Sequence, residues 1–199
     1  MAKVITVSRK FPDYHIRSGQ STGFVEKINN WSWDAVEIPE FGGCGYLDAL
    51  IYLNPGIDEK HLEQLNDSCD PEIKEIKSHT IREGKRWKTG DYASLRVWGY
   101  DINPKSGRSG PYQSKQIIIA PDIEIKKVWD FEIRKSEGGI DDCFVLNGIE
   151  YLPDGEDSEA LINEISENDG LNQEDLLDWF RYPKPFSGQI ICWNENIEY

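Results

Sequence analysis

A cluster of strand-like patterns in the middle of the chain constrains the fold more than any other feature of the sequence. Four stretches alternate apolar and polar residues or run apolar, with many β-branched and aromatic side chains: 79–82, 91–101, 114–120 and 122–134. Such patterns predict strands. Turn signals rich in glycine or proline separate them. We therefore expect three or four neighbouring strands in this part of the chain.

Further elements flank this cluster on both sides. Val4–Ser8 and 188–193 are predicted strands, and Asn147-Gly148 between the apolar runs of 143–152 is the strongest short hairpin signal. Helical spacing of apolar residues predicts helices over 24–28, 57–67, 158–168 and 173–180, with N-caps at Thr22, Ser158 and Asn172. Because the first and last strands lie far apart in sequence, we expect a single mixed sheet or barrel closed by the chain's two ends, rather than two tandem domains.

The charge of the chain is acidic overall but uneven along its length. Its 22 Lys and Arg residues and 36 Asp and Glu residues give a formal net charge of −14. Residues 1–73 carry 6 basic and 12 acidic side chains, residues 74–135 carry 14 and 8, and residues 136–199 carry 2 and 16, so the net charges are −6, +6 and −14. Extended duplex DNA and anionic membranes repel such a protein. Its basic central segment can still dock a small or single-stranded anion, unless the acidic C-terminal part folds over it.

The sequence shows neither a targeting segment nor a cofactor motif. Its first residues lack the apolar stretch of a signal peptide, and no segment approaches the length of a membrane span. The four cysteines lie far apart, with no Cys-x-x-Cys pair: Cys44, Cys69, Cys143 and Cys192. We expect reduced cysteines in a cytoplasmic protein, with no metal and no cofactor. His61 is predicted to be structural, and His15 either binds a ligand or serves as a capping or surface group.

The segment 77–91 has the composition of a ligand-binding stretch. It contains five cations, two hydroxyls before Arg82, an imidazole, Trp87 and two glycines that let a backbone approach closely. Arg82 can form a forked contact with a phosphate or carbonyl, and Trp87 can stack on a base. The alternative is structural: a basic β-turn with Trp87 in the core. On the binding interpretation, the basic edge consists of Lys77, Arg82, Lys85, Arg86 and Lys88.

The same segment resembles the signature of the ASCH domain, a member of the PUA-like superfamily of small β-barrels. The resemblance rests on Lys77-x-x-Thr80-Ile81-Arg82 and on the Trp-Lys-x-Gly-Asp motif at 87–91. Residues 24–28, 123–133 and 168–180 are similar to the preceding helix, the following barrel strand and the C-terminal element. The resemblance implies an α+β fold, a PUA-like mixed β-barrel of about five to seven strands with flanking helices. One domain would span 1–199, with an insertion at about 31–72 and an acidic extension at about 136–160.

The resemblance also implies a function. Domains of that superfamily bind RNA or nucleosides in a cleft beside the barrel, and some small ASCH proteins are amidohydrolases that deacylate N4-acetylcytidine. By this resemblance Thr80 is the nucleophile, Lys77 its general base, and Asp169 the counterpart of a family glutamate. Asp169 is one methylene shorter than glutamate, so either a backbone shift compensates for the difference or activity is lost.

Elementary chemistry adds a geometric condition to this assignment. A threonine hydroxyl is a weak nucleophile unless a base removes its proton, and a lysine does so only when burial or a neighbouring cation such as Arg82 lowers its pKa. Residues three apart on a regular strand point to opposite faces. Lys77 must therefore precede the strand if it is to meet Thr80. Thr80 and Arg82 share a face in any case, and the structural alternative for Thr80 is an ordinary β-branched strand residue.

Three functions remain open at this level. We favour binding of RNA, a nucleotide or a modified nucleoside at the basic edge, without turnover. The second function is deacylation of an N4-acylated cytidine-type nucleoside by Lys77, Thr80 and Asp169. The third is a protein-interaction module whose acidic C-terminal face meets a basic partner.

Overall fold

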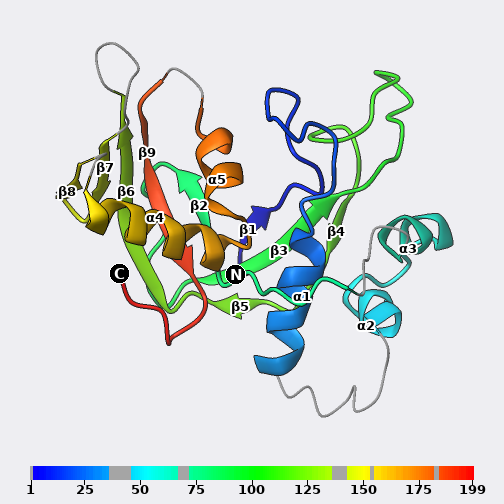
Figure 1. The fold of residues 1–199 in the computed structure, drawn as a ribbon. Coiled ribbons are helices and arrows are strands. Elements are labelled where there is room, and N and C mark those ends of the chain that lie inside the picture. The colour runs from blue at the N-terminus through cyan, green and yellow to red at the C-terminus, as the bar shows by residue number, and fades with distance from the viewer. Residues whose placement is uncertain (1, 36–45, 67–71, 136–142, 153–154, 182–183) are drawn as a thin grey trace. The chain divides into compact units, whose positions relative to one another are not determined.

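The computed structural model describes residues 2–35, 46–66, 72–135, 143–152, 155–181 and 184–199. These ranges contain five helices and nine strands (Figure 1), which confirms the predicted α+β class. The described strands form two separate sheets, and neither is a closed barrel. The expectation of one mixed sheet joining the two ends of the chain is wrong, because the first and last strands belong to different sheets.

Two compact units make up the chain, and their segments are interleaved. Unit 1 consists of Met1–Phe11, Gln20–Ile76 and Tyr92–Ile123, and unit 2 of Pro12–Gly19, Lys77–Asp91 and Glu124–Tyr199. The expected insertion at about 31–72 therefore falls in unit 1, and the acidic extension at about 136–160 in unit 2. The interpretation of the chain as a single domain stays a prediction.

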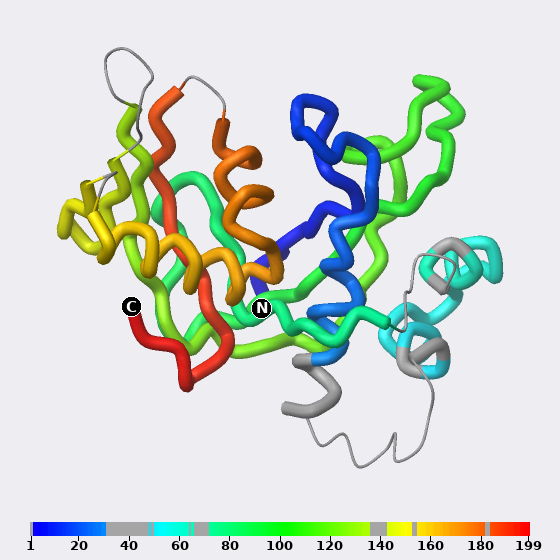
Figure 2. The backbone as a smooth tube through the Cα atoms, in the orientation of Figure 1, coloured from blue at the N-terminus to red at the C-terminus, as the bar shows by residue number. Residues whose placement is uncertain are grey.

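Unit 1 contains a sheet with the strand order β1-β3-β4 and three helices. Strand β1 (Lys3–Thr6) pairs in parallel with β3 (Tyr92–Trp98), which pairs antiparallel with β4 (Gln116–Ile118). The helices are α1 (Phe24–Ala35), α2 (Tyr46–Leu53) and α3 (Glu59–Asn66). Between β3 and β4 the backbone makes a long excursion over residues 99–115 (Figure 2). The buried core includes Ile5, Ile28, Leu50, Leu65, Leu95 and Ile117.

Unit 2 is an antiparallel sheet with two helices, α4 (Glu156–Asp169) and α5 (Gln173–Trp179). Its strand order is β2 (His79–Glu83), β9 (Phe186–Cys192), β6 (Lys127–Arg134), β7 (Cys143–Leu146) and β8 (Ile149–Tyr151). Helix α4 runs across one face of this sheet (Figure 1). The core includes Phe131, Ile133, Ile162, Ile165, Ile190 and Ile191. The short β5 (Ile123–Glu124) lies where the chain passes between the units.

Local turn and cap signals in unit 2 are mostly confirmed. Asn147 and Gly148 both have positive φ, 49° and 85°, as a tight type I′ hairpin turn requires. Asn172 caps α5, since its side chain accepts a hydrogen bond from the Asp175 amide. The predicted cap at Ser158 is wrong: α4 begins at Glu156, after an N-cap at Gly155, and Ser158 is buried within the first turn.

Two further expectations can be placed on the described residues. Cys192 is buried and Cys143 is partly exposed, and neither forms a disulfide, whereas Cys44 and Cys69 lie outside the described residues. Among the helices that the structure describes, none has both the length and the apolar character that crossing a bilayer requires.

Candidate functional site

Strand β2 and the two residues before it carry Lys77, Thr80 and Arg82 in unit 2. The strand begins at His79, so Lys77 precedes it, as the sequence argument required for a meeting with Thr80. Thr80 and Arg82 are two residues apart on the strand and share a face. Lys77 is fully buried, Thr80 is 5% exposed and Arg82 is half-buried. The segment therefore runs from the interior of unit 2 towards its surface.

The central contact is an ion pair between Lys77 and Asp169. Lys77 Nζ lies 2.7 Å from Asp169 Oδ1 and donates a hydrogen bond of 2.7 Å to the Asp169 backbone carbonyl. Only 6% of Asp169 is exposed. Both residues are among the predicted site residues, and the aspartate side chain reaches the lysine.

Local backbone geometry fixes the position of Asp169. It is the last residue of α4, and the helix ends at Gly170 in the left-handed conformation, φ 75°. The Ser78 amide donates to the Asn168 carbonyl at 2.8 Å, which ties the end of α4 to the approach to β2. On the other side, Trp193 Nε1 donates to the Lys77 carbonyl at 3.0 Å. The charged pair is thus held by neighbours from three parts of the chain.

His79 and Tyr199 extend the buried cluster, and the sequence analysis did not single them out. His79 Nε2 lies 3.6 Å from Asp169 Oδ1, and its Nδ1 lies 2.9 Å from the Tyr199 hydroxyl. Burial, together with the positive charge of Lys77, holds the pKa of His79 well below its ordinary value. Burial likewise raises the pKa of Tyr199. Both side chains are therefore neutral at physiological pH, and the formal charges beside them are those of Lys77 and Asp169.

Arg82 brings a second cation into the electrostatic range of Asp169. Burial lowers the pKa of the Arg82 guanidinium, the charge of Asp169 opposes this shift, and the charge of Arg86 adds to it. Arginine nevertheless stays charged at neutral pH. Asp169 thus lies near the cations Lys77 and Arg82, in a part of unit 2 with little contact with water.

The turn after β2 carries the remaining predicted cations. Lys85, Arg86 and Lys88 are all exposed, and Gly84 and Gly90 have positive φ, 82° and 86°. Lys85 pairs with Asp130 at 2.8 Å. The Arg86 guanidinium lies 5.9 Å from the centre of the Trp87 ring. The turn is therefore a basic, solvated surface that follows β2.

Trp87 lies in the core, which was the structural alternative in the sequence analysis. It is 2% exposed, and its backbone amide donates to Gln189 Oε1 of β9 at 3.0 Å. A ring buried to this extent presents no face on which a base can stack. We therefore do not retain Trp87 as a ligand-binding residue.

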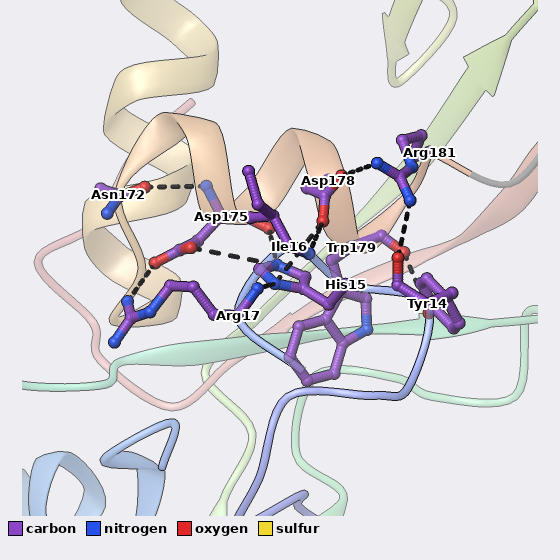
Figure 3. Close-up of polar contacts among 9 residues, drawn as sticks. All are labelled: Tyr14, His15, Ile16, Arg17, Asn172, Asp175, Asp178, Trp179 and Arg181. Carbon is purple, nitrogen blue, oxygen red and sulfur yellow. Dashed lines mark hydrogen bonds and ion pairs between the residues drawn. The ribbon is translucent and has the colours of Figure 1, made fainter. Parts of the chain in front are cut away.

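A second polar cluster in unit 2 joins the loop 12–19 to α5 (Figure 3). His15 is 3% exposed; its Nε2 lies 3.0 Å from the Asp175 carbonyl, and its Nδ1 accepts the Arg17 amide at 3.0 Å. Asp178 accepts the Ile16 amide at 2.6 Å. Both ring nitrogens of His15 are thus engaged within the protein. Its role here is to anchor the loop on α5, so neither ligand binding nor an exposed surface role fits it.

His61 has a comparable structural role in unit 1. It is 2% exposed and lies between Asp58, 2.5 Å from Nδ1, and Asp101, 2.6 Å from Nε2. These contacts join α3 to the segment after β3. The predicted structural role of His61 is confirmed.

Chemically, the buried cluster of unit 2 can hold and move a proton. Lys77 and Asp169 form a donor–acceptor pair at hydrogen-bond distance, and the hydroxyl of Thr80 follows on the adjacent strand. Such buried ionisable groups are typical of functional sites, although structural ion pairs share the feature. No group of three or more His, Cys, Asp or Glu side chains suited to a metal occurs in the part of the chain that the structure describes. Comparisons of the chain with family models, with curated proteins and with solved structures gave no match.

Proposed function

We propose that unit 2 binds RNA, a nucleotide or a modified nucleoside at the β2 site, defined as Lys77, Thr80, Arg82, Arg86, Lys88 and Asp169. The observation that carries this proposal is the half-buried Arg82 beside the buried Lys77–Asp169 pair, on the same strand face as Thr80. A guanidinium at the border between interior and solvent can fork onto a phosphate or a ring carbonyl. Thr80 can then donate or accept a hydrogen bond at the edge of a base, and the Asp169 carboxylate can accept one.

The surrounding turn favours a small ligand. Arg86 and Lys88 are exposed and can contact phosphate groups, and Lys85 pairs with Asp130. The chain's net charge of −14 opposes a long polyanion. The ligand of the β2 site is therefore a mononucleotide, a nucleoside or a few nucleotides of a single strand.

Isothermal titration with cytidine 5′-monophosphate tests this proposal. We expect Arg82→Gln to weaken binding about tenfold or more, because a charge-assisted contact contributes about 1.5–3 kcal/mol. The matched control is Arg134→Gln in β6, an exposed arginine of the same unit that pairs with Glu150. Equal affinity in wild type and Arg82→Gln, or no binding at all, would contradict the proposal.

A second candidate function is deacylation of an N4-acylated cytidine-type nucleoside. It is favoured by the 2.7 Å contact between the two residues that the ASCH resemblance names as base and acid. Lys77 can take the proton of Thr80 only after one ammonium proton has passed to Asp169, and their contact allows this transfer. Thr80 then attacks the acyl carbonyl, the nucleoside amine leaves with the proton from Lys77, and water hydrolyses the threonine ester.

Incubation with N4-acetylcytidine and chromatographic separation of the products tests the catalytic candidate. We expect cytidine from the wild type, with Thr80→Val and Lys77→Met reducing the rate at least about a hundredfold, as for loss of a nucleophile or base. Arg134→Gln is again the control. If the wild type yields no cytidine, or if Thr80→Val reacts at an undiminished rate, catalysis by these residues is rejected. Binding without turnover then remains the proposed function.

Membership of the ASCH family, the PUA-like barrel and a cytoplasmic location are part of the same proposal. The signature at 77–91 is the support for the family and for the barrel. An experimental structure that places β2 and β9 outside any PUA-like arrangement would contradict the fold assignment.

A further inference from the structure

Unit 1 contains a cavity that the proposed function does not use. Its volume is about 150 Å³, and its lining includes Val7, Arg9, Lys10, Trp98, Tyr100 and Pro111. All of these residues belong to unit 1, so the cavity is separate from the β2 site. The walls are mainly carbon, from a valine, a proline and two aromatic rings.

The size of the cavity selects its occupant. A cavity of about 150 Å³ lined by apolar side chains holds a molecule of the size of benzene. The cavity is partly open to solvent, and its volume has room for one six-membered aromatic ring.

The charged side chains around the cavity indicate which charge its ligand carries. The Arg9 guanidinium lies 3.7 Å from the centre of the Tyr100 ring, and Lys10 Nζ lies 6.0 Å from it. Stacking on an aromatic ring holds a guanidinium in place. Two cations beside an apolar cavity favour an anionic group on the ligand.

The loop 99–115 that forms one wall is tightly organised. The Ser114 hydroxyl donates to the Asp101 carbonyl and accepts the Gly110 amide, both at 2.8 Å, and the Gly99 amide donates to the Lys115 carbonyl at 2.8 Å. Long loops with their own internal hydrogen bonds are frequently functional. The wall is therefore built into the fold rather than formed by a loose surface segment.

Tyr112 in this loop is held in an unfavourable conformation. Its φ is 62°, in the left-handed region that bulky residues rarely adopt, and it is 87% exposed. Its ring lies 5.4 Å from Trp98, which lines the cavity. Such strain persists at ligand clamps and other functional sites. Here it keeps a large aromatic side chain in water, beside a wall of the cavity.

We propose that this cavity, the ring pocket, binds a small molecule with one aromatic ring and an anionic group. The ring enters between Trp98, Tyr100 and Pro111, and its carboxylate or phosphate meets Arg9 and Lys10. An arene carboxylate and a pyrimidine nucleotide both have this chemistry. Separate titrations with a member of each class distinguish these two kinds of ligand.

The test uses the full chain and two probes, 4-fluorobenzoate and uridine 5′-monophosphate, followed by ligand-observed NMR and isothermal titration. We expect at least one probe to bind, and Tyr100→Ala and Lys10→Gln each to weaken it about fivefold to tenfold. Tyr100→Phe keeps the ring and should bind like the wild type. The matched controls Tyr92→Ala and Lys60→Gln change an exposed tyrosine and an exposed lysine of unit 1 elsewhere.

Two analogues test the stated ligand chemistry. Neutral 4-fluorobenzamide should bind about tenfold more weakly than 4-fluorobenzoate, and 2-naphthoate should bind no more tightly than 4-fluorobenzoate because the cavity has room for only one of its rings. Binding of neither probe at millimolar concentration overturns the proposal. So does binding of 4-fluorobenzoate that Tyr100→Ala leaves unchanged. Where only uridine 5′-monophosphate binds, loss of that binding in Arg82→Gln but not in Tyr100→Ala assigns it to the β2 site and counts against the ring pocket.

Discussion

Lys77 and Asp169 place two opposite charges in a part of unit 2 that has almost no contact with water. Desolvation of such a pair costs several kcal/mol, and the mutual attraction offsets it only while both partners are present. Asp169 has Arg82 as a further positive neighbour, and His79 close by is neutral. The free energy of unfolding should therefore depend strongly on keeping the pair intact.

A double-mutant comparison tests this expectation. We predict that Lys77→Met lowers the free energy of unfolding by about 3–5 kcal/mol, because it leaves the Asp169 carboxylate buried without its main partner. Lys77→Met combined with Asp169→Asn should recover much of the loss. Urea unfolding of the three proteins measures both values. A double variant less stable than Lys77→Met alone would contradict a compensated pair.

The buried His79 predicts a pH dependence of stability. Its pKa is lowered in the folded state, whereas in the unfolded chain it takes a proton near pH 6.5. The unfolded state then binds more protons, so the contribution is fully present above about pH 6.5 and is lost as the pH falls towards the folded pKa. The expected loss is about 1.4 kcal/mol per pH unit.

Urea unfolding between pH 7.5 and 5.5 measures this slope, and His79→Gln should reduce it by about one proton. The imidazole signals of His79 in NMR spectra should also stay constant over the same range. A His79 signal that titrates near pH 6.5 would show that the side chain is not held neutral.

At the scale of the elements, the pairing of β2 with β9 holds the site in shape. Gly188 of β9 pairs with Glu83. A Cβ atom at Gly188 would lie 2.1 Å from the Arg82 carbonyl oxygen, far inside van der Waals contact. Glycine is therefore required at this position by the close approach of the two backbones.

Gly188→Ala should consequently push β2 away from β9. We predict a loss of about 1–3 kcal/mol in the free energy of unfolding, together with weaker ligand binding because Thr80 and Arg82 move with the strand. The control is Ser187→Ala, at the exposed neighbouring position. Unchanged stability of Gly188→Ala in thermal unfolding would contradict the close packing of these strands.

The sequence predicts those elements whose signals are local. Asn147-Gly148 and Asn172 act within a few residues of their own positions, and the structure confirms both. Ser158 misled the prediction because the turn at Gly155 starts α4 before the serine. The partition of the strands into two sheets was missed, since alternation reveals the face of a strand but not its partner.

The site residues likewise divide into those with a local sequence signal and those whose contacts join distant parts of the chain. Lys77 and Thr80 stand out in the sequence through one short motif, and Asp169 through the resemblance that this motif suggests. Tyr199 meets His79 across 120 residues, and no local pattern encodes that contact. Trp87 carried the pattern of a stacking residue, and only its burial shows that it serves the core.

At the scale of the whole molecule, uneven charge limits the length of nucleic acid that can bind. The segment of +6 lies between segments of −6 and −14. We predict that binding of a short single strand depends on salt with a slope of about −1.4 to −2.1, as two or three phosphate contacts require. A 20-nucleotide strand should bind no more than severalfold more tightly than a trinucleotide.

Filter binding over a salt series measures both quantities. In the same salt series, Arg86→Gln and Lys88→Gln should each make the slope shallower by the contribution of about one phosphate contact. A slope steeper than about −4 would indicate an extended polyanion track, which the acidic ends of the chain argue against.

The most direct test of ligand binding at the β2 site is an NMR titration of the ¹⁵N-labelled protein with cytidine 5′-monophosphate. We expect saturable shifts of the amide signals of β2 and its following turn, among them Thr80, Arg82 and Arg86, and their loss in Arg82→Gln. Shifts at saturation that leave residues 79–90 unchanged, or no shifts at all, would contradict a nucleoside-type ligand at the β2 site.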